Sequence, residues 1–92
     1  MRIDWSAHAV ADLEAIVAYI EQDRNLETAN RVGRTIYEAV QTLQSLPHRG
    51  RAGRVKNTRE LVLPRLPYFV VYQVLEDQVL ILNIVHGARR WP

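Results

Sequence analysis

Two segments in the first half of the chain repeat their apolar positions with helical spacing. Residues 7–22 place one set on a single helix face: Val10, Leu13, Ile16, Val17 and Ile20. Residues 27–45 repeat the spacing with a second set: Ala29, Val32, Ile36, Val40 and Leu43. Ser6 fits the N-cap of the first helix, and Pro47 with Gly50 ends the second. The pattern therefore predicts two amphipathic helices, each with one face toward a core.

The break between these helices is short and polar. Residues 23–27 (DRNLE) contain Asn25, a residue type common in turns. Because so few residues connect the helices, they must fold back on one another as an antiparallel hairpin. Their apolar faces then point toward the remaining chain.

Strand patterns flank this hairpin. Residues 1–5 (MRIDW) alternate apolar and polar side chains, as a short strand does. Three later segments are rich in β-branched, aliphatic and aromatic residues: 59–63 (RELVL), 67–74 (PYFVVYQV) and 79–86 (VLILNIVH). Residues 48–56 (HRGRAGRVK) have no hydrophobic period and indicate an exposed loop or a short irregular edge strand.

The connections between the later strands are short enough for a meander. Residues 64–67 form a turn between the first two, and Glu76 with Asp77 forms a tight hairpin turn before the third. The predicted fold is therefore α+β with the order β-α-α-β-β-β, a helical hairpin packed on one face of a twisted antiparallel sheet.

Length and composition limit what this fold can carry. The chain has 92 residues, which makes one domain, 1–92, with a single core. It has no cysteine, and His8, His48 and His86 lack metal-ligand spacing, so we expect no disulfide and no metal. No glycine pattern for a nucleotide cofactor is present, and no cofactor is expected. No secretory or membrane-spanning pattern appears, so we expect a cytoplasmic protein without a membrane partner.

The net charge of +2 hides an asymmetry between the two halves. Residues 1–46 carry four arginines and seven acidic residues, whereas residues 47–92 carry seven arginines and Lys56 against three acidic residues. Concentrated arginine attracts anionic partners, such as nucleic acid or an acidic protein segment. A solvated basic surface is the plainer interpretation of the same residues.

The end of the last predicted strand gathers chemically active side chains. After the apolar run of residues 79–85 come His86, Arg89, Arg90 and Trp91, with Gly87 permitting a sharp exit from the strand. Imidazole titrates near neutrality and guanidinium groups form forks for phosphate or carboxylate. The alternatives are a histidine that closes the strand and an ordinary basic chain end.

The segment 67–74 has apolar residues on both strand faces. Phe69 and Val71 share one face, and a second set shares the other: Tyr68, Val70, Tyr72 and Val74. We expect Tyr68 and Tyr72 to pack in the core. Because the helical hairpin covers only one face, we expect an exposed apolar patch rimmed by arginine on the other, and such patches mark interaction sites.

The order of strand, helical hairpin and three-stranded meander resembles the RelE/ParE toxin superfamily, as do the stretches GRAGRVKNTRELVL, PYFVVYQV and VLILNIVHGARRWP. The resemblance covers essentially the whole chain. It implies the toxin of a bacterial type II toxin–antitoxin module. RelE-type members cut messenger RNA in the ribosome, ParE-type members poison DNA gyrase, and the fold alone does not choose between them.

A metal-free ribonuclease needs a base, an acid and cations around the phosphate. His86 and Arg89 are the candidate catalytic residues, with Tyr68 a weaker proton donor, and phosphate could be held by Arg54, Arg59, Arg65 and Arg89. The resemblance opposes this activity, because Glu60, Val62 and Phe69 stand where RelE-type nucleases carry basic catalytic side chains. Arg89 does match the family's arginine after the last strand.

The comparison with RelE therefore favours a ParE-like gyrase poison that is not an enzyme. Other nucleases of the superfamily use a histidine near the end of this strand, so His86 keeps the nuclease alternative open. A non-catalytic nucleic-acid-binding module is the third alternative, because a basic surface attracts phosphate without chemistry.

The resemblance also implies the partners. An antitoxin would wrap the toxin with an acidic C-terminal segment, as a helix and an added strand, in a heteromeric complex. Its acidic residues would meet five arginines: Arg49, Arg51, Arg54, Arg59 and Arg65. The target, gyrase or ribosome, would be bound by the chain end: His86, Arg89, Arg90 and Trp91.

Overall fold

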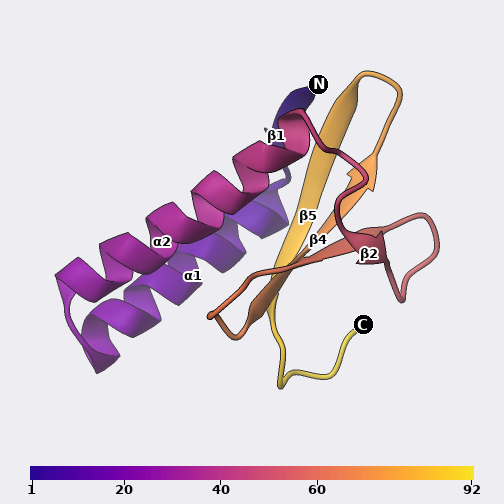
Figure 1. The fold of residues 1–92 in the computed structure, drawn as a ribbon. Coiled ribbons are helices and arrows are strands. Elements are labelled where there is room, and N and C mark those ends of the chain that lie inside the picture. Colours follow the sequence, from indigo (N-terminus) through magenta and orange to yellow (C-terminus); the bar gives the residue numbers. More distant parts are fainter.

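Two helices lie side by side on one face of a five-stranded sheet (Figure 1). A computed structural model describes all residues, 1–92. The helices are α1 (Ala7–Asp23) and α2 (Leu26–Gln41), and α2 continues into a 3-10 turn, η1 (Thr42–Gln44). The strands are β1 (Arg2–Trp5), β2 (Arg51–Ala52), β3 (Arg59–Val62), β4 (Tyr68–Val74) and β5 (Gln78–His86). Their order in the sheet is β1-β5-β4-β3-β2.

Side-chain caps begin both helices. The Ser6 hydroxyl accepts a hydrogen bond from Ala9 N at 3.1 Å, so the predicted N-cap of α1 is confirmed. Asn25 caps α2 in the same way, because its Oδ1 accepts from Thr28 N at 2.7 Å. The polar break between the helices thus starts α2 as well as ending α1.

The predicted α+β fold with a helical hairpin on one sheet face is confirmed, with one difference in the sheet. β1 pairs with β5 in parallel, whereas β2, β3, β4 and β5 pair antiparallel in sequence order. The sheet is therefore mixed rather than antiparallel throughout. The alternation in β1 specifies which side chains face the core, but the partner strand is set by long-range packing.

The main core lies between the helices and the sheet. All five predicted apolar positions of the second helix pattern are buried there: Ala29, Val32, Ile36, Val40 and Leu43. In α1 the face toward the core begins with Ala9 in place of Val10, because Ala9 is fully buried while Val10 is 42% exposed. Ala9, Leu13, Ile16 and Ile20 follow the helical spacing, so the prediction that Val10 belongs to the core is wrong.

A β-bulge in β5 decides which way the end of this strand points. Val71 pairs with Asn83 while Tyr72 pairs with Ile81, which leaves Leu82 as an extra residue. Beyond the bulge, Ile84 pairs with Val70 and the alternation of faces is reversed. His86 consequently pairs with Tyr68 and shares its side of the sheet. An unbroken alternation from Val79 would have turned His86 to the opposite side.

Groups of Ser6 and α1 form hydrogen bonds to the backbone of β5 where its pairing with β1 ends. Ser6 N donates to Ile81 O at 2.9 Å, and the Ser6 hydroxyl donates to Leu82 O at 3.0 Å. Asp12 Oδ2 accepts from Ile84 N at 2.9 Å and from Asn83 Nδ2 at 3.2 Å. Since unpaired backbone groups are costly when shielded from water, these bonds hold the bulge in place.

The sheet face turned away from the helices, here called the second face, carries a small cluster of Phe69, Val71 and Val85. The prediction that this face would leave Phe69 and Val71 exposed is wrong, because they are only 4% and 1% exposed. Trp91, from the chain end, packs against this cluster. Figure 1 shows the segment after β5 curling back from the strand end.

Candidate functional site

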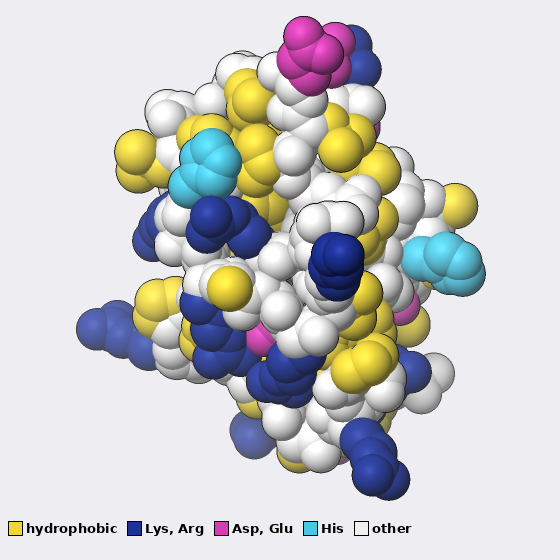
Figure 2. Space-filling view, turned by 90° about the vertical axis from the view of Figure 1, so that its right-hand side faces the viewer, with side chains coloured by type: hydrophobic (Ala, Val, Ile, Leu, Met, Phe, Trp, Pro, Cys, Tyr) yellow, Lys and Arg dark blue, Asp and Glu magenta, His cyan; other side chains and the backbone are white.

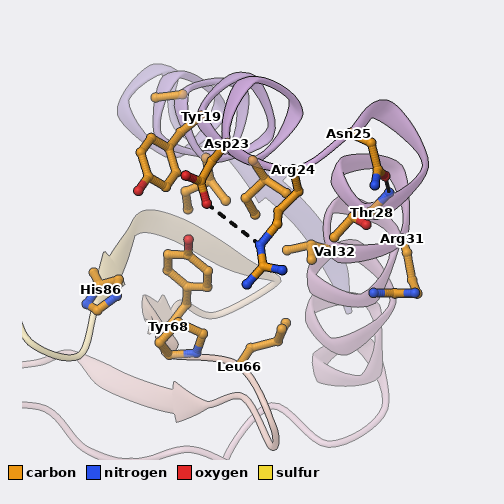
Figure 3. Close-up of a pocket in the computed structure, with 14 residues that line it drawn as sticks. Tyr19, Asp23, Arg24, Asn25, Thr28, Arg31, Val32, Leu66, Tyr68 and His86 are labelled. Atoms are coloured by element: carbon orange, nitrogen blue, oxygen red, sulfur yellow. Dashed lines mark hydrogen bonds and ion pairs between the residues drawn. The ribbon is translucent and has the colours of Figure 1, made fainter.

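His86 ends β5 beside Tyr68, with the two rings edge to face and their centroids 5.4 Å apart (Figure 3). His86 Nδ1 accepts a hydrogen bond from Ala88 N at 3.0 Å. The neutral imidazole therefore carries its proton on Nε2, which is the nitrogen available to a ligand. The structure thus brings together His86 and Tyr68, two of the predicted site residues.

The chain turns sharply after His86. Arg89 N donates to His86 O at 2.9 Å, and Gly87 N donates to Pro67 O at 2.6 Å. Gly87 does not use the left-handed backbone region, and a Cβ there would make only an ordinary contact at 3.4 Å. The sharp exit from the strand is thus made by these hydrogen bonds and does not use the backbone freedom that glycine permits.

The other predicted residues of the chain end differ in their surroundings. Arg89 and Arg90 are exposed, whereas Trp91 is half-buried against the second face. Trp91 Nε1 is buried and has no hydrogen-bond partner. An unpaired buried donor costs about 1–3 kcal/mol, so the tail is held by apolar packing at the expense of one lost bond.

Two grooves meet at His86 and Tyr68. The larger, here the helix-side groove, holds about 810 Å³ between the ends of the helical hairpin and the β3–β4 turn (Figure 3). The smaller groove holds about 450 Å³ on the other side, where Arg51, Arg54 and Phe69 join the lining. His86 and Tyr68 line both grooves, so they stand between them.

The pKa of Tyr68 is raised above its ordinary value. Burial of the hydroxyl is the larger cause, and the nearby hydroxyl of Tyr19 adds to it. The phenol therefore stays protonated at neutral pH and is a hydrogen-bond donor to whatever occupies either groove.

A buried carboxylate organises the arginines at the edge of the sheet. Glu60 has a side chain 1% exposed, and its Oε1 accepts from Arg51 Nε and Nη2 at 3.1 and 2.9 Å. Its Oε2 accepts from Arg54 N at 3.1 Å, and Arg54 Nε lies 3.7 Å from Oε1. Burial alone would raise the pKa of Glu60, but these hydrogen bonds and charges outweigh it and the pKa is lowered.

The guanidinium groups of Arg51 and Arg54 also lie over the Phe69 ring, at 5.9 and 5.2 Å from its centroid. A cation over an aromatic face is attracted to it. Glu60 and Phe69 therefore fix both arginines, while about half of each guanidinium side chain remains exposed: Arg51 51% and Arg54 48%.

The remaining predicted arginines are held differently. Arg59 Nη1 donates to Gly50 O at 2.8 Å and to His48 O at 3.3 Å, and Arg49 Nη1 donates to Thr42 Oγ1 at 2.7 Å. Arg65 is exposed in the β3–β4 turn, where its φ of 67° lies in the left-handed region. Figure 2 shows Lys and Arg side chains spread over the face opposite the helices, with apolar side chains between them.

Tyr72 anchors the loop between η1 and β2, which carries Arg49. Its hydroxyl donates to Pro47 O and accepts from Gly50 N, each at 2.8 Å, and the residue is fully buried. Burial raises the pKa of Tyr72, against the smaller opposing effects of Gly50 N and the charges of Arg59 and Arg49. The prediction that Tyr72 packs in the core is confirmed, and its hydroxyl adds a role that the pattern did not indicate.

Sequence reasoning missed several residues that shape this region. Asp12 and the groove residues Tyr19 and Arg24 carry no local signal, because only packing brings α1 against the end of β5. Glu60 had a signal, since it is the one acidic residue among five basic residues between residues 49 and 60. Such an isolated acid in a basic stretch favours an ion-paired position.

No helix is both long and apolar enough to cross a membrane. No group of three or more His, Asp and Glu side chains lies close enough together to hold a metal ion.

Comparisons with known proteins match this chain over nearly its full length. Residues 3–91 match the family model described as the ParE toxin of the type II toxin–antitoxin system parDE. The Sinorhizobium fredii protein Y4kP, which carries a toxin description, is 44% identical over 91 residues, covering 99% of this chain and 93% of that protein. Toxin RelE2 of Caulobacter vibrioides is 35% identical over 88 residues, covering 96% of this chain and 97% of the relative.

The fold agrees with these matches. A chain in a solved structure titled as the chromosomal ParDE toxin–antitoxin system of P. aeruginosa superposes with a TM-score of 0.88 and 31% identity, covering 94% of this chain and 95% of that one. Relatives named for both RelE and ParE are similar over the whole domain, so the match establishes the toxin family rather than one target. The helical hairpin on a five-stranded sheet, matched along almost every residue, places this chain in the ParE toxin family of type II toxin–antitoxin systems.

Proposed function

We propose that this toxin acts on DNA gyrase, in the manner of ParE-type proteins, and does not cut RNA. The supporting observation lies on the second face. Glu60, Val62 and Phe69 stand where RelE-type nucleases carry basic catalytic side chains. Val62 pairs directly with Phe69, and Glu60 is two residues from Val62 on the same strand. One compact area of the sheet therefore presents a carboxylate and two apolar side chains.

These side chains are unsuited to metal-free phosphodiester cleavage. Such cleavage needs proton transfer and cations aimed at the phosphate. Val62 and Phe69 have no titratable group, and the Glu60 carboxylate is engaged by Arg51 and Arg54. The guanidinium groups that remain nearby are turned onto Phe69 and Glu60, which favours a structural role for this cluster.

The surroundings of His86 point the same way. Its Nδ1 accepts a hydrogen bond from Ala88 N within the chain, and no carboxylate forms a hydrogen bond or ion pair with the ring to orient it. A histidine used as a general base generally has such an orienting partner. In this proposal the chain end binds the target by shape and charge, through His86, Arg89, Arg90 and Trp91.

The same proposal includes a cognate antitoxin and a cytoplasmic site of action. The antitoxin would place acidic residues against Arg49, Arg51, Arg54, Arg59 and Arg65. Four of these lie on or beside the short edge strand β2, which leaves one side of the sheet open to an added strand. Arg65 stands apart in the β3–β4 turn.

The test is a pair of assays with the purified toxin. With gyrase and plasmid DNA we expect accumulation of cleaved DNA, which the paired variant Arg89→Glu/Arg90→Glu weakens by about tenfold or more, as reversal of contacting charges does. Arg34→Glu, on the exposed face of α2, is the matched control and should behave as wild type. With ribosomes and messenger RNA we expect no cleavage. Ribosome-dependent cleavage without any effect on gyrase would contradict the proposal.

A RelE-like nuclease is the second candidate, favoured by one observation. His86 and Tyr68 are in ring contact, so an imidazole and a protonated phenol stand together at the mouth of both grooves. If this pair were catalytic, His86→Ala would lower RNA cleavage by about a hundredfold or more.

A further inference from the structure

The helix-side groove is lined mainly by residues that have no part in the proposed gyrase and antitoxin contacts, His86 being shared. It lies between the end of α1, the start of α2 and the β3–β4 turn (Figure 3). Its volume of about 810 Å³ is in the range of sites that enclose small organic ligands. None of the five arginines proposed to meet the antitoxin lines it. Arg51 and Arg54 line only the smaller groove, which shares His86 and Tyr68 with this one.

One side of the groove is built from flat side chains. Tyr68, Tyr19 and His86 line it together, and Tyr19 is 65% exposed. Figure 3 shows the two phenol rings on the same side, with their hydroxyl groups approaching one another. Aromatic rings of this kind offer stacking surfaces for planar ligands, and base stacking on them is a general mode of nucleotide recognition.

The opposite side supplies positive charge. Arg24 extends into the groove, where its Nε forms an ion pair with Asp23 Oδ2 at 3.8 Å, a distance too long for a hydrogen bond (Figure 3). Its terminal nitrogens point into the groove, where they could bind an anion. Arg31 adds a second guanidinium from α2, and Asp23 is the only carboxylate in the lining. The groove therefore carries an excess of positive charge before His86 is counted.

The floor between the aromatic and cationic sides is apolar. Ile16, Ile20, Val32 and Leu66 line it, and Asn25 with Thr28 adds polar groups beside the arginines. A ligand that fits must therefore be flat at one end, anionic at the other, and apolar enough between them to lie on aliphatic side chains. A base, a ribose and a phosphate meet these requirements in that order.

We propose that the helix-side groove binds a nucleoside phosphate, either a free nucleotide or the phosphorylated end of a single strand. The base lies against Tyr19 and Tyr68, and the phosphate lies between Arg24 and Arg31. Guanidinium forks match phosphate oxygens, and the sequence-tolerant stacking surface accepts any base. This site goes beyond the proposed action on gyrase and does not depend on it.

The test is calorimetric titration of the full chain with AMP, GMP, CMP and UMP, and with a 5′-phosphorylated hexanucleotide beside its unphosphorylated form. Tight binding of mononucleotides assigns the site to free nucleotides. Preference for the phosphorylated hexanucleotide assigns it to strand ends. We expect Arg24→Gln to weaken binding by about tenfold or more, through loss of a charge-assisted contact. Tyr19→Ala should weaken it by roughly fivefold to a hundredfold through loss of stacking.

Arg34→Gln, outside the groove, is the matched control and should leave the affinity unchanged. Tyr19, Arg24 and Arg34 are exposed, so thermal denaturation should show that all three variants fold like wild type. The proposal is overturned if none of the nucleotides or hexanucleotides binds, or if binding survives Arg24→Gln. It is also overturned if a hexaglutamate peptide binds in an Arg24-dependent way while nucleotides do not. Because the readout is direct binding, a negative gyrase assay would leave this result standing.

Discussion

Removing the Tyr72 hydroxyl should release the loop between η1 and β2 from the sheet. Tyr72→Phe keeps the ring, which is fully buried, and deletes only the atom that binds Pro47 O and Gly50 N at 2.8 Å each. Gly50 is itself buried, and a Cβ there would come within 2.7 Å of the Tyr72 hydroxyl. The loop therefore approaches the sheet too closely for water to replace the lost partner.

The expected loss follows from these two bonds. A typical internal hydrogen bond contributes about 0.5–1.5 kcal/mol, and a buried amide left without a partner costs about 1–3 kcal/mol. We therefore expect the free energy of unfolding to fall by about 2–3 kcal/mol. In a domain of this size each kcal/mol lowers the melting temperature by about 4–8 °C, so the fall should be roughly 10–20 °C.

The effect should also depend on pH, with a sign fixed by the raised pKa of Tyr72. A group whose pKa is higher in the folded state stabilises the fold fully below its unfolded pKa, about 10 for tyrosine. That contribution is lost as the pH rises through the folded pKa. The gap between wild type and Tyr72→Phe should consequently be widest near neutrality and shrink above about pH 10.

Urea denaturation of both proteins between neutral and alkaline pH measures these quantities. Tyr37→Phe is the matched control, because Tyr37 is 49% exposed and the change should alter stability by less than about 0.5 kcal/mol. If Tyr72→Phe were as stable as wild type at pH 7, the hydroxyl would not anchor the loop and this reasoning would fail.

Three further changes test other parts of the structure. Glu60→Gln should lower stability by about 1–3 kcal/mol, since its charge pairs with half-exposed arginines. Because the pKa of Glu60 is lowered, that difference should disappear in urea titrations as the pH falls through its folded pKa. Asp12→Ala should lower the free energy of unfolding by about 1–3 kcal/mol and speed hydrogen exchange at the Ile84 amide, which donates to Asp12. Unchanged exchange would show that the bulge is stable without Asp12. Antitoxin association, followed by stopped flow, should slow as salt rises, and a rate indifferent to ionic strength would remove the electrostatic part of the proposed complex.

The sequence by itself determined the elements whose stability is local. The apolar spacing of α2 predicted its buried face at every position, and the Ser6 cap followed from residue type and place alone. The meander of β3, β4 and β5 followed from strand composition and short connections. These features depend on neighbours a few positions away, so their signals lie within short windows of the chain.

The tertiary structure decided the features that depend on distant partners. The bulge beside Val71 reverses the alternation in β5 and sets His86 beside Tyr68, although nothing in the local sequence marks it. The buried Glu60 fixes Arg51, and Trp91 covers a face that the pattern left open. Charge counts identified the basic half of the chain, but only packing shows which guanidinium groups are engaged. The physical reason is that a residue's chemistry is local, whereas its direction and its partners are set by contacts between segments far apart in the chain.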